Sequence, residues 1–442
     1  MEQAWLEELS ELLRIPSVSA DPAHVSDVRR AAEWVRDFVR RAGGDAELVE
    51  TGTQPLVVGE IRASRNADRA PTVLAYGHFD VQPPQPLDLW TSPPFEPTID
   101  GEWLVARGVA DDKGQLFALL KAAELLALGG ELPVNVRVAC DGEEETGGHA
   151  IADFLAADER GADACLIFDG GMTRRGVPEF MIATRGLLAF DLRVRTGERD
   201  LHSGMYGNAA LNAIHALAET LQGVLPVDGH APTQLHVGVA PLTDEERASW
   251  AELTPGAEML AAQGAVPNDE RAAEEFYLRT TAEPSVDVNG ILGGKPGLRN
   301  TTLPVFAEAN FTVRLAPGQD PRAVSEAVDR LIHEAAPAGA TVELERGEPP
   351  ARPGLVPPDT PAVQLALAAF ERVFGRRPLL VRIGGTLPII PALADKGIPT
   401  VLTGVALAES QIHSPNERLL LEYIPLGVEA ARECYRAFAD LG

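Results

Sequence analysis

The chain has 442 residues, of which 45% are hydrophobic and 23% charged, a composition typical of a folded globular protein and not of a disordered one. At about 150 residues per domain, this length predicts two or three structural units. Its 38 Lys and Arg residues against 65 Asp and Glu residues give a net charge of −27. Such an acidic surface argues against nucleic-acid and membrane partners.

The sequence also indicates where the protein resides. It has no run of about 18 uncharged apolar residues, the length that spans a bilayer. Its start, MEQAWLEELSELLRIP, has the spacing of an acidic amphipathic helix and lacks the basic start and the cleavage site of a signal peptide. Cys140, Cys165 and Cys434 are isolated in apolar surroundings, which favours buried thiols over disulfides or zinc fingers. We therefore expect a cytoplasmic protein.

From residue 1 to about 185, helical and strand patterns alternate. Four segments have the apolar spacing of helices: 5–13, 31–39, 114–128 and 149–157. Four short apolar runs have the length of buried strands: 56–61, 72–75, 134–139 and 165–168. Buried strands interleaved with helices predict an α/β domain with a mostly parallel sheet and helices on both faces.

A different pattern begins near residue 185. Segments 188–194 and 308–315 alternate apolar and polar residues, as strands with one solvated face do, and 341–345 is predicted to be a third, short strand. Two further segments have helical spacing: 209–221 and 323–335. This combination predicts an α+β unit with an antiparallel sheet that helices cover on one face.

Prolines gathered between residues 349 and 361 predict a linker, after which the α/β pattern returns. The returning segments are helices at 363–374 and 424–438 and buried strands at 379–381 and 400–402. The simplest organisation is one α/β domain, residues 1–185 and 353–442, that is split by an inserted α+β domain at 186–352.

Five short segments carry the chemically active side chains, and most of them lie at or just past the ends of predicted strands. They are YGHFDVQP with His78 and Asp80, RGVADDKGQ with Asp111, ACDGEEETGG with Glu144 and Glu145, LIFDGG with Asp169, and QIHSPNE with His413. Ligands of open α/β sheets bind at the carboxyl ends of strands, so we expect these side chains to gather at one edge.

Taken singly, each segment has an ordinary structural explanation. His78 could be a core histidine, the Asp111-Asp112 pair a helix N-cap, the three glutamates a solvated loop, and Asp169 a turn residue. Gathered at one edge, however, the carboxylates would repel one another unless positive charge lay among them. Few basic residues are nearby in the sequence, which favours a metal centre.

The ligand types narrow the choice of metal. Histidine nitrogen and carboxylate oxygen without thiolate suit Zn²⁺, Mn²⁺ or Co²⁺. Two histidines and three carboxylates are more ligands than one open catalytic zinc ion takes. They suit two ions about 3.5–4 Å apart that share a bridging ligand and activate a water molecule. Glu144 and Glu145 could supply one ligand and one general base, because neighbours on an extended segment point opposite ways.

In order and spacing, HFDVQP, GVADDKG, EEETGG, Asp169 and IHSPNE resemble the dinuclear metallopeptidases of family twenty. That family includes aminoacylases, carboxypeptidase G, desuccinylases, and the carnosine and cytosolic nonspecific dipeptidases. The resemblance extends over essentially the whole chain. It implies a zinc-exopeptidase-like catalytic domain with an inserted lid and dimerisation domain, and a hydrolase that uses two divalent metal ions, Zn²⁺ before Mn²⁺ or Co²⁺.

The resemblance also implies a ligand set. His78 and Asp169 match the ligands of one ion, Glu145 and His413 match those of the other, and Asp111 matches the bridge. In the family the peptide bond after the bridging aspartate is cis, so we expect a cis bond after Asp111.

Two further carboxylates match roles beside the metals. Glu144 matches the general base, and Asp80 matches the carboxylate that orients His78, a role that chemistry also assigns to an aspartate near a metal-bound imidazole. The family often has a neutral residue before the base, whereas this chain has Glu143, whose charge would alter the pKa of Glu144.

In the predicted insert, RDLHSGMYGN resembles a segment of the dipeptidase branch whose histidine, here His202, reaches the active site of the partner subunit. Thr301 and Arg314 match substrate contacts in the insert, and Thr386, in RIGGTLP, matches a substrate contact from the main domain. Arg314 could equally occupy a solvated position of an alternating strand, although a substrate carboxylate would suit its guanidinium.

Together these patterns and the family resemblance predict a metallo-exopeptidase that hydrolyses dipeptides or short peptides, and the resemblance implies a homodimer formed by the inserted domain. A deacylase or desuccinylase of N-acyl amino acids is the nearest alternative, because it would use the same chemistry. The two differ at the substrate's N-terminal side, where a dipeptidase needs an acidic group for an ammonium. A non-enzymatic binding protein on the same fold would require a lost ligand or base, and none is missing.

Overall fold

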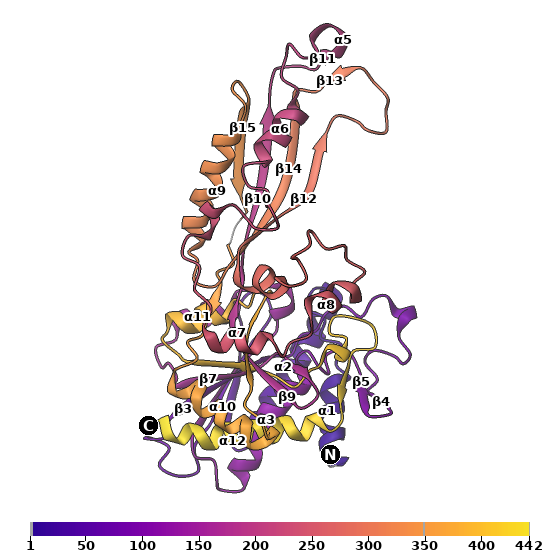
Figure 1. The fold of residues 1–442 in the computed structure, drawn as a ribbon. Helices are drawn as coiled ribbons and strands as arrows, with labels where there is room; N and C mark the ends of the chain where they lie inside the picture. Colours follow the sequence, from indigo (N-terminus) through magenta and orange to yellow (C-terminus); the bar gives the residue numbers. More distant parts are fainter. Residues whose placement is uncertain (1–2, 348–349, 442) are drawn as a thin grey trace. The chain divides into compact units, whose positions relative to one another are not determined.

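The computed structural model describes residues 3–347 and 350–441, and contacts within the chain divide it into two units (Figure 1). Unit 1 comprises Met1–Ile182, Val356–Val381 and Pro388–Gly442, and unit 2 comprises Ala183–Leu355 and Arg382–Leu387. Pro349, in the predicted linker, lies outside the described residues.

Unit 1 is built around a six-stranded sheet with the strand order β1-β2-β6-β3-β7-β18. The strands are β1 Asp45–Val49, β2 Leu56–Ile61, β3 Thr72–His78, β6 Asn135–Asp141, β7 Ala164–Phe168 and β18 Thr400–Thr403. Strands β6, β3, β7 and β18 run parallel, while β1 and β2 pair antiparallel. The central strands are buried along almost their whole length, which explains their nearly continuous apolar sequences.

Two groups of helices pack on this sheet. The first group contacts β1, β2, β3, β7 and β18 and consists of α1 Gln3–Leu13, α2 Val25–Arg41, α3 Lys113–Leu128, α10 Pro361–Phe374 and α12 Tyr423–Ala437. The second group contacts β6 and β18 and consists of α4 Ala150–Ala157 and α11 Ile389–Asp395. The predicted α/β architecture with a mostly parallel sheet is therefore confirmed.

Two smaller sheets of short strands lie in unit 1 and at the points of the chain where the two units meet in sequence. One sheet has the order β19-β5-β4 and consists of β4 Thr98–Asp100, β5 Trp103–Val105 and β19 Arg418–Leu420. Another consists of β8 Met172–Arg174, β9 Val177–Thr184, β16 Gly354–Leu355 and β17 Leu379–Ile383. All three cysteines are buried and free, as predicted.

Unit 2 is an α+β structure around an antiparallel sheet of order β12-β14-β10-β15. Its strands are β10 Gly186–Arg195, β12 Ser285–Gly293, β14 Phe306–Leu315 and β15 Thr341–Arg346. Helices α6 Ala213–Leu221 and α9 Pro321–Ala335 pack on β10, β14 and β15, and the buried side chains of β10 and β14 alternate with exposed ones. This is the predicted antiparallel sheet with helices on one face.

Shorter elements complete unit 2: β11 Leu201–His202, α5 Ser203–Tyr206, α7 Asp244–Trp250, α8 Gly256–Ala262 and β13 Thr302–Leu303. In Figure 1, β11, β13 and α5 lie together at one end of this unit. No helix in the described part of the chain is long and apolar enough to cross a membrane.

Two differences from the predicted elements have clear physical reasons. Strand β3 continues three residues past the predicted end, to His78, because it pairs with β6 as far as Asp141. Strand β12 was not predicted, because Asn289-Gly290 has the sequence of a turn; the structure has a register shift between Val288 and Gly290 instead.

Candidate metal centre

The predicted metal ligands lie at the carboxyl ends of the parallel strands of unit 1. His78 is the last residue of β3, Asp169 directly follows β7, and Asp111 lies two residues before α3. Glu145 belongs to a short turn of 3-10 helix, Glu144–Thr146, that follows β6. This is the edge at which ligands of open α/β sheets bind.

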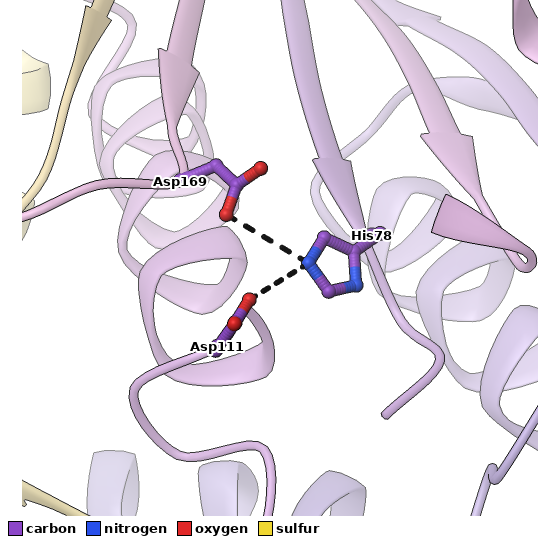
Figure 2. A group of neighbouring side chains, drawn as sticks. All are labelled: His78, Asp111 and Asp169. Carbon is purple, nitrogen blue, oxygen red and sulfur yellow. Dashed lines mark hydrogen bonds and ion pairs between the residues drawn. The ribbon is translucent and has the colours of Figure 1, made fainter. Parts of the chain in front are cut away.

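Five side chains form two groups that share Asp111. In the first group, Nε2 of His78 lies 3.0 Å from Oδ1 of Asp111 and 3.8 Å from Oδ1 of Asp169 (Figure 2). In the second, Nε2 of His413 lies 2.9 Å from Oδ2 of Asp111 and 3.0 Å from Oε2 of Glu145. Within each group the ligand atoms lie within 4.8 Å of one another. Asp111 thus offers one carboxylate oxygen to each group.

The donor sets fit divalent metal ions. Each group combines imidazole nitrogen with carboxylate oxygen, the ligands that zinc and similar ions accept in proteins. Burial acts to lower the pKa of His78, but the carboxylates of Asp111 and Asp169 raise it well above its ordinary value. Hydrogen bonds to Asp111 and Glu145 raise the pKa of His413 to about 10. Both groups therefore attract positive charge, as a metal site must.

Asp80 fixes the imidazole of His78. Its Oδ1 lies 3.3 Å and its backbone oxygen 3.1 Å from Nδ1 of His78, which leaves Nε2 facing the first group. Asp80 is fully buried, and its Oδ2 accepts hydrogen bonds from Oγ of Ser19 at 2.6 Å and from the backbone N–H of Glu145 at 3.2 Å. One carboxylate thereby connects the two groups and sets the orientation of the His78 imidazole.

Glu144 lies beside both groups without belonging to either. Its Oε2 is 4.0 Å from Nε2 of His78, whereas the side chain of Glu145 turns to His413. The two carboxylates therefore separate on a single 3-10 turn and not on the extended segment assumed from the sequence. Burial, reinforced by the charges of Asp169 and Asp111, raises the pKa of Glu144 to about 8.

Asp112 and Glu143, the acidic residues next to Asp111 and Glu144, form hydrogen bonds with backbone N–H groups. Asp112 occupies the N-cap position of α3, yet its side chain does not cap the helix; its Oδ2 accepts the backbone N–H of His78 at 3.1 Å. The Asp111–Asp112 peptide bond is cis, as expected. Glu143 accepts the N–H of Ala150 at 3.0 Å, at the start of α4, so its carboxylate serves a helix end.

Two supporting residues were missed in the sequence. Gln82 donates from Nε2 to Oε2 of Glu145 at 2.8 Å and from its backbone N–H to Oε1 at 3.2 Å. Glu417, fully buried, accepts from Nη1 of Arg107 at 2.7 Å and from three backbone N–H groups, those of Gly108, Ala110 and Asp111. Gln82 belongs to the motif HFDVQP and Glu417 to the motif QIHSPNE. Their position within these motifs was the sequence signal that could have identified them as supporting residues.

The four predicted substrate residues lie in unit 2 as two pairs. His202 is exposed, and in the pairing of β11 with β13 it lies opposite Thr302. The backbone N–H of Ser203, the next residue, donates to the backbone oxygen of Thr301 at 2.8 Å. Arg314, near the end of β14, donates from Nη1 to Oγ1 of Thr386 at 3.2 Å. Thr386 therefore groups with the sheet of unit 2, whereas the sequence analysis assigned it to the main domain.

Comparison with known proteins identifies the family. The model of the family described as "Peptidase family M20/M25/M40" matches residues 74–437. The chain belongs to this peptidase family. Its membership confirms the resemblance that the motifs suggested, and with the two donor groups it makes the chain a hydrolase of a metallopeptidase family with candidate metal-binding residues.

Individual relatives extend over nearly the whole chain. A cysteinylglycine-S-conjugate dipeptidase of Corynebacterium striatum is 30% identical, covering 93% of this chain and 90% of its own length. A beta-Ala-His dipeptidase of Rattus norvegicus is 27% identical, covering 94% of this chain and 89% of its own. An M20 family metallo-carboxypeptidase from Sulfolobus solfataricus, Sso-CP2, has a similar structure, with a TM-score of 0.81, 27% identity and full coverage of both chains.

Proposed function

We propose that this protein is a dipeptidase that hydrolyses the amide bond of dipeptides or short peptides with two divalent metal ions. The observation that carries the proposal is the pair of histidine–carboxylate groups that share Asp111. The relatives named as dipeptidases support the substrate class, because they align with more than nine-tenths of the chain.

We assign His78, Asp111 and Asp169 to one ion and Asp111, Glu145 and His413 to the other. Zn²⁺ is the ion we propose, because both groups offer imidazole and carboxylate without thiolate; Mn²⁺ and Co²⁺ accept the same donors. Two such ions, when bound, polarise a scissile carbonyl and lower the pKa of a water between them.

Residues of the protein then transfer the proton and orient the proposed ligands. Glu144, next to both groups but bound to neither, accepts the proton of the attacking water and passes it to the leaving amine. Asp80 holds His78 with Nε2 facing the first group, and Gln82 holds both oxygens of Glu145. With these hydrogen bonds in place, the ligands need little reorganisation to bind.

The substrate carboxylate is proposed to bind Arg314 and Thr386. Arg314 donates to a hydroxyl and forms no ion pair with a carboxylate among the described residues, so its guanidinium retains donors for an anion. A guanidinium binds a carboxylate in a bidentate manner, which suits the free carboxyl end of a dipeptide.

The positions of the substrate residues support a homodimer. Arg314 lies near the end of β14, while His202 and Thr301 lie beside β13, before β14 begins at Phe306. Eight strand residues at about 3.4 Å each separate the two pairs by about 27 Å. A dipeptide spans only about 7 Å, so it cannot contact both pairs of one chain. We therefore propose that His202 and Thr301 act in the site of a partner subunit, His202 on the developing oxyanion.

Features of unit 2 and of the cysteines support the remaining proposals. Edge strand β12 exposes Ile291 and Leu292, 63% and 60% accessible, which suits a dimer contact through this unit. The buried free thiols suit a reducing compartment, so we propose a cytoplasmic location.

An activity panel tests the proposed function. Metal-stripped protein is reconstituted separately with Zn²⁺, Mn²⁺ or Co²⁺ and assayed on dipeptides, N-acetyl amino acids and N-succinyl-diaminopimelate, with bound metal measured in parallel. We expect about two metal equivalents per chain and hydrolysis of dipeptides. Hydrolysis of the acylated substrates alone would replace the dipeptidase assignment with a deacylase one.

A further inference from the structure

Unit 2 contains a second candidate binding site, a pocket of about 520 Å³ whose lining includes none of the five residues of the donor groups. Residues 226–231, 260–287 and Arg185 line it, and all of them belong to unit 2. Its volume falls within the roughly 300–1,000 Å³ that is usual for small-molecule sites.

Arg185 is the unusual residue of this pocket. It is only 8% exposed, and its Nε has no hydrogen-bond partner. Its Nη1 donates only to the backbone oxygens of Arg279 and Glu283, both at a long 3.3 Å. In the described part of the chain it forms no ion pair with a carboxylate. A buried guanidinium normally has an anionic partner, because burying an unpaired charge is costly.

The other charged groups of the pocket do not supply that partner. Arg279 is bound to Asp269 and Glu275, and Glu283 accepts from His230 at 2.7 Å, so these charges are already paired. Arg314 adds a second positive charge: burial and the charge of Arg314 lower the pKa of Arg185 to about 10, while the charge of Asp287 acts in the opposite direction. Arg185 therefore stays protonated at neutral pH, and the charges that act on it are those of Arg314 and of Asp287, which is exposed.

The rest of the lining is largely apolar. Leu260, Phe276 and Pro226 line the same pocket as Arg185. Such a combination of one buried cation with apolar walls suits a ligand that has one anionic end and one hydrocarbon end. A phosphate or sulfate would leave the apolar walls unused.

We propose that this pocket binds a small organic carboxylate, whose carboxylate pairs with the Arg185 guanidinium and whose apolar portion lies against Leu260 and Phe276. A free amino acid and a carboxylic acid without an amino group share this chemistry. They differ because the ammonium of the amino acid would also pair with the exposed carboxylate of Asp287, which lines the same pocket.

Calorimetric titration of the full-length protein tests the proposal with three probes of one size: 4-methylpentanoate, leucine and 4-methylpentan-1-ol. We expect both acids to bind and the alcohol to bind at least about 10-fold more weakly, since it lacks the charged hydrogen bonds. Tighter binding of leucine than of 4-methylpentanoate would identify an amino acid as the ligand, and the reverse order an acid without the amino group. Absence of binding of both acids would overturn the proposal.

Variants locate the binding. Arg185→Gln is expected to weaken carboxylate binding roughly 10-fold or more. Arg195→Gln is the matched control, because Arg195 is an exposed arginine at the far end of β10, the strand that begins directly after Arg185, and it lies over the ring of Phe306; it should leave binding unchanged. Loss of binding in Arg314→Gln with retention in Arg185→Gln would place the carboxylate on Arg314 and refute the assignment.

A second variant covers the case in which Arg185→Gln does not fold. Leu260→Trp fills the pocket from its partly exposed wall and leaves the buried guanidinium intact, so it should abolish binding of both acids. Unchanged binding in Leu260→Trp would show that the ligand lies elsewhere. Because binding is measured without hydrolysis, failure of this proposal and failure of the dipeptidase proposal are distinguishable.

Discussion

Glu417 is expected to hold the segment that carries Asp111. Its carboxylate is fully buried, and it accepts hydrogen bonds from Arg107 and from three backbone N–H groups of the segment that ends at Asp111. Replacing it by Gln removes the negative charge and leaves the guanidinium of Arg107, only 1% exposed, without a counter-charge. Breaking a buried pair in this way costs about 3–5 kcal/mol of unfolding free energy.

The expected value for Glu417→Gln lies near the lower end of that range. The amide oxygen of Gln can still accept some of the backbone N–H groups, and burial already disfavours the ionised form by raising the pKa of Glu417 to about 7. We therefore expect a loss of about 3 kcal/mol. At roughly 2–4 °C per kcal/mol for a unit of this size, the unfolding midpoint should fall by roughly 6–12 °C.

Thermal unfolding of the metal-free protein measures this effect, and titration with Zn²⁺ measures its consequence for the metal centre. Displacing Asp111 should weaken metal binding roughly 10–100-fold, as loss of a group that supports a ligand does. Glu50→Gln is the matched control, because its pair with Arg29 at 2.8 Å is exposed and such pairs contribute at most about 1 kcal/mol. Equal midpoints and equal metal affinities for the two variants would refute the anchoring role of Glu417.

Three further predictions follow from the site and the fold. Glu144→Gln should retain both metal equivalents but lower turnover by about 10²–10⁴-fold, measured by metal analysis beside kinetics; loss of one equivalent would make Glu144 a ligand. Mixing inactive His202→Ala with inactive Glu144→Gln should restore about half of the wild-type activity per mixed dimer, whereas proven heterodimers without activity would refute a shared site. Burial raises the pKa of Glu179 from 4.5 to about 6, so the folded protein should lose stability as the pH rises through that interval. In denaturant unfolding, Glu179→Gln should therefore be more stable than the wild type by about 2 kcal/mol at pH 8 but not at pH 4.

The sequence was most informative where the chemistry is local. Strand β2 was predicted with its exact bounds, and His78 and Asp169 were placed at the ends of strands, because the buried strands of this sheet have largely apolar sequences. The gathering of carboxylates around two histidines followed from that placement together with their mutual repulsion. The individual roles, in contrast, came from resemblance to a family, since spacing alone cannot distinguish a bridging aspartate from a helix cap.

Contacts between distant parts of the sequence could not be predicted in this way. Glu417 lies 310 residues from Arg107, and no periodic pattern connects a loop glutamate to a buried arginine so far away. Strand β12 was hidden by Asn289-Gly290, a pair that favours turns in isolation but here accommodates a register shift. Arg185 likewise has the local sequence of an ordinary strand residue, and only the loops folded over it create its pocket.

The same long-range contacts explain how a very acidic chain keeps a cluster of carboxylates in one place. Asp111 receives His78 on one oxygen and His413 on the other, while its backbone N–H is held by Glu417, so one ligand depends on three distant segments. His413 and Glu417 lie in the same short loop, which therefore supplies both a proposed ligand and the anchor of the proposed bridging residue. Within each group an imidazole contacts two carboxylates, so a protonated histidine offsets part of the repulsion between them before any metal binds. In the proposed enzyme, metal ions would replace these protons at prearranged donors, so the fold would not have to assemble the ligands around the ions.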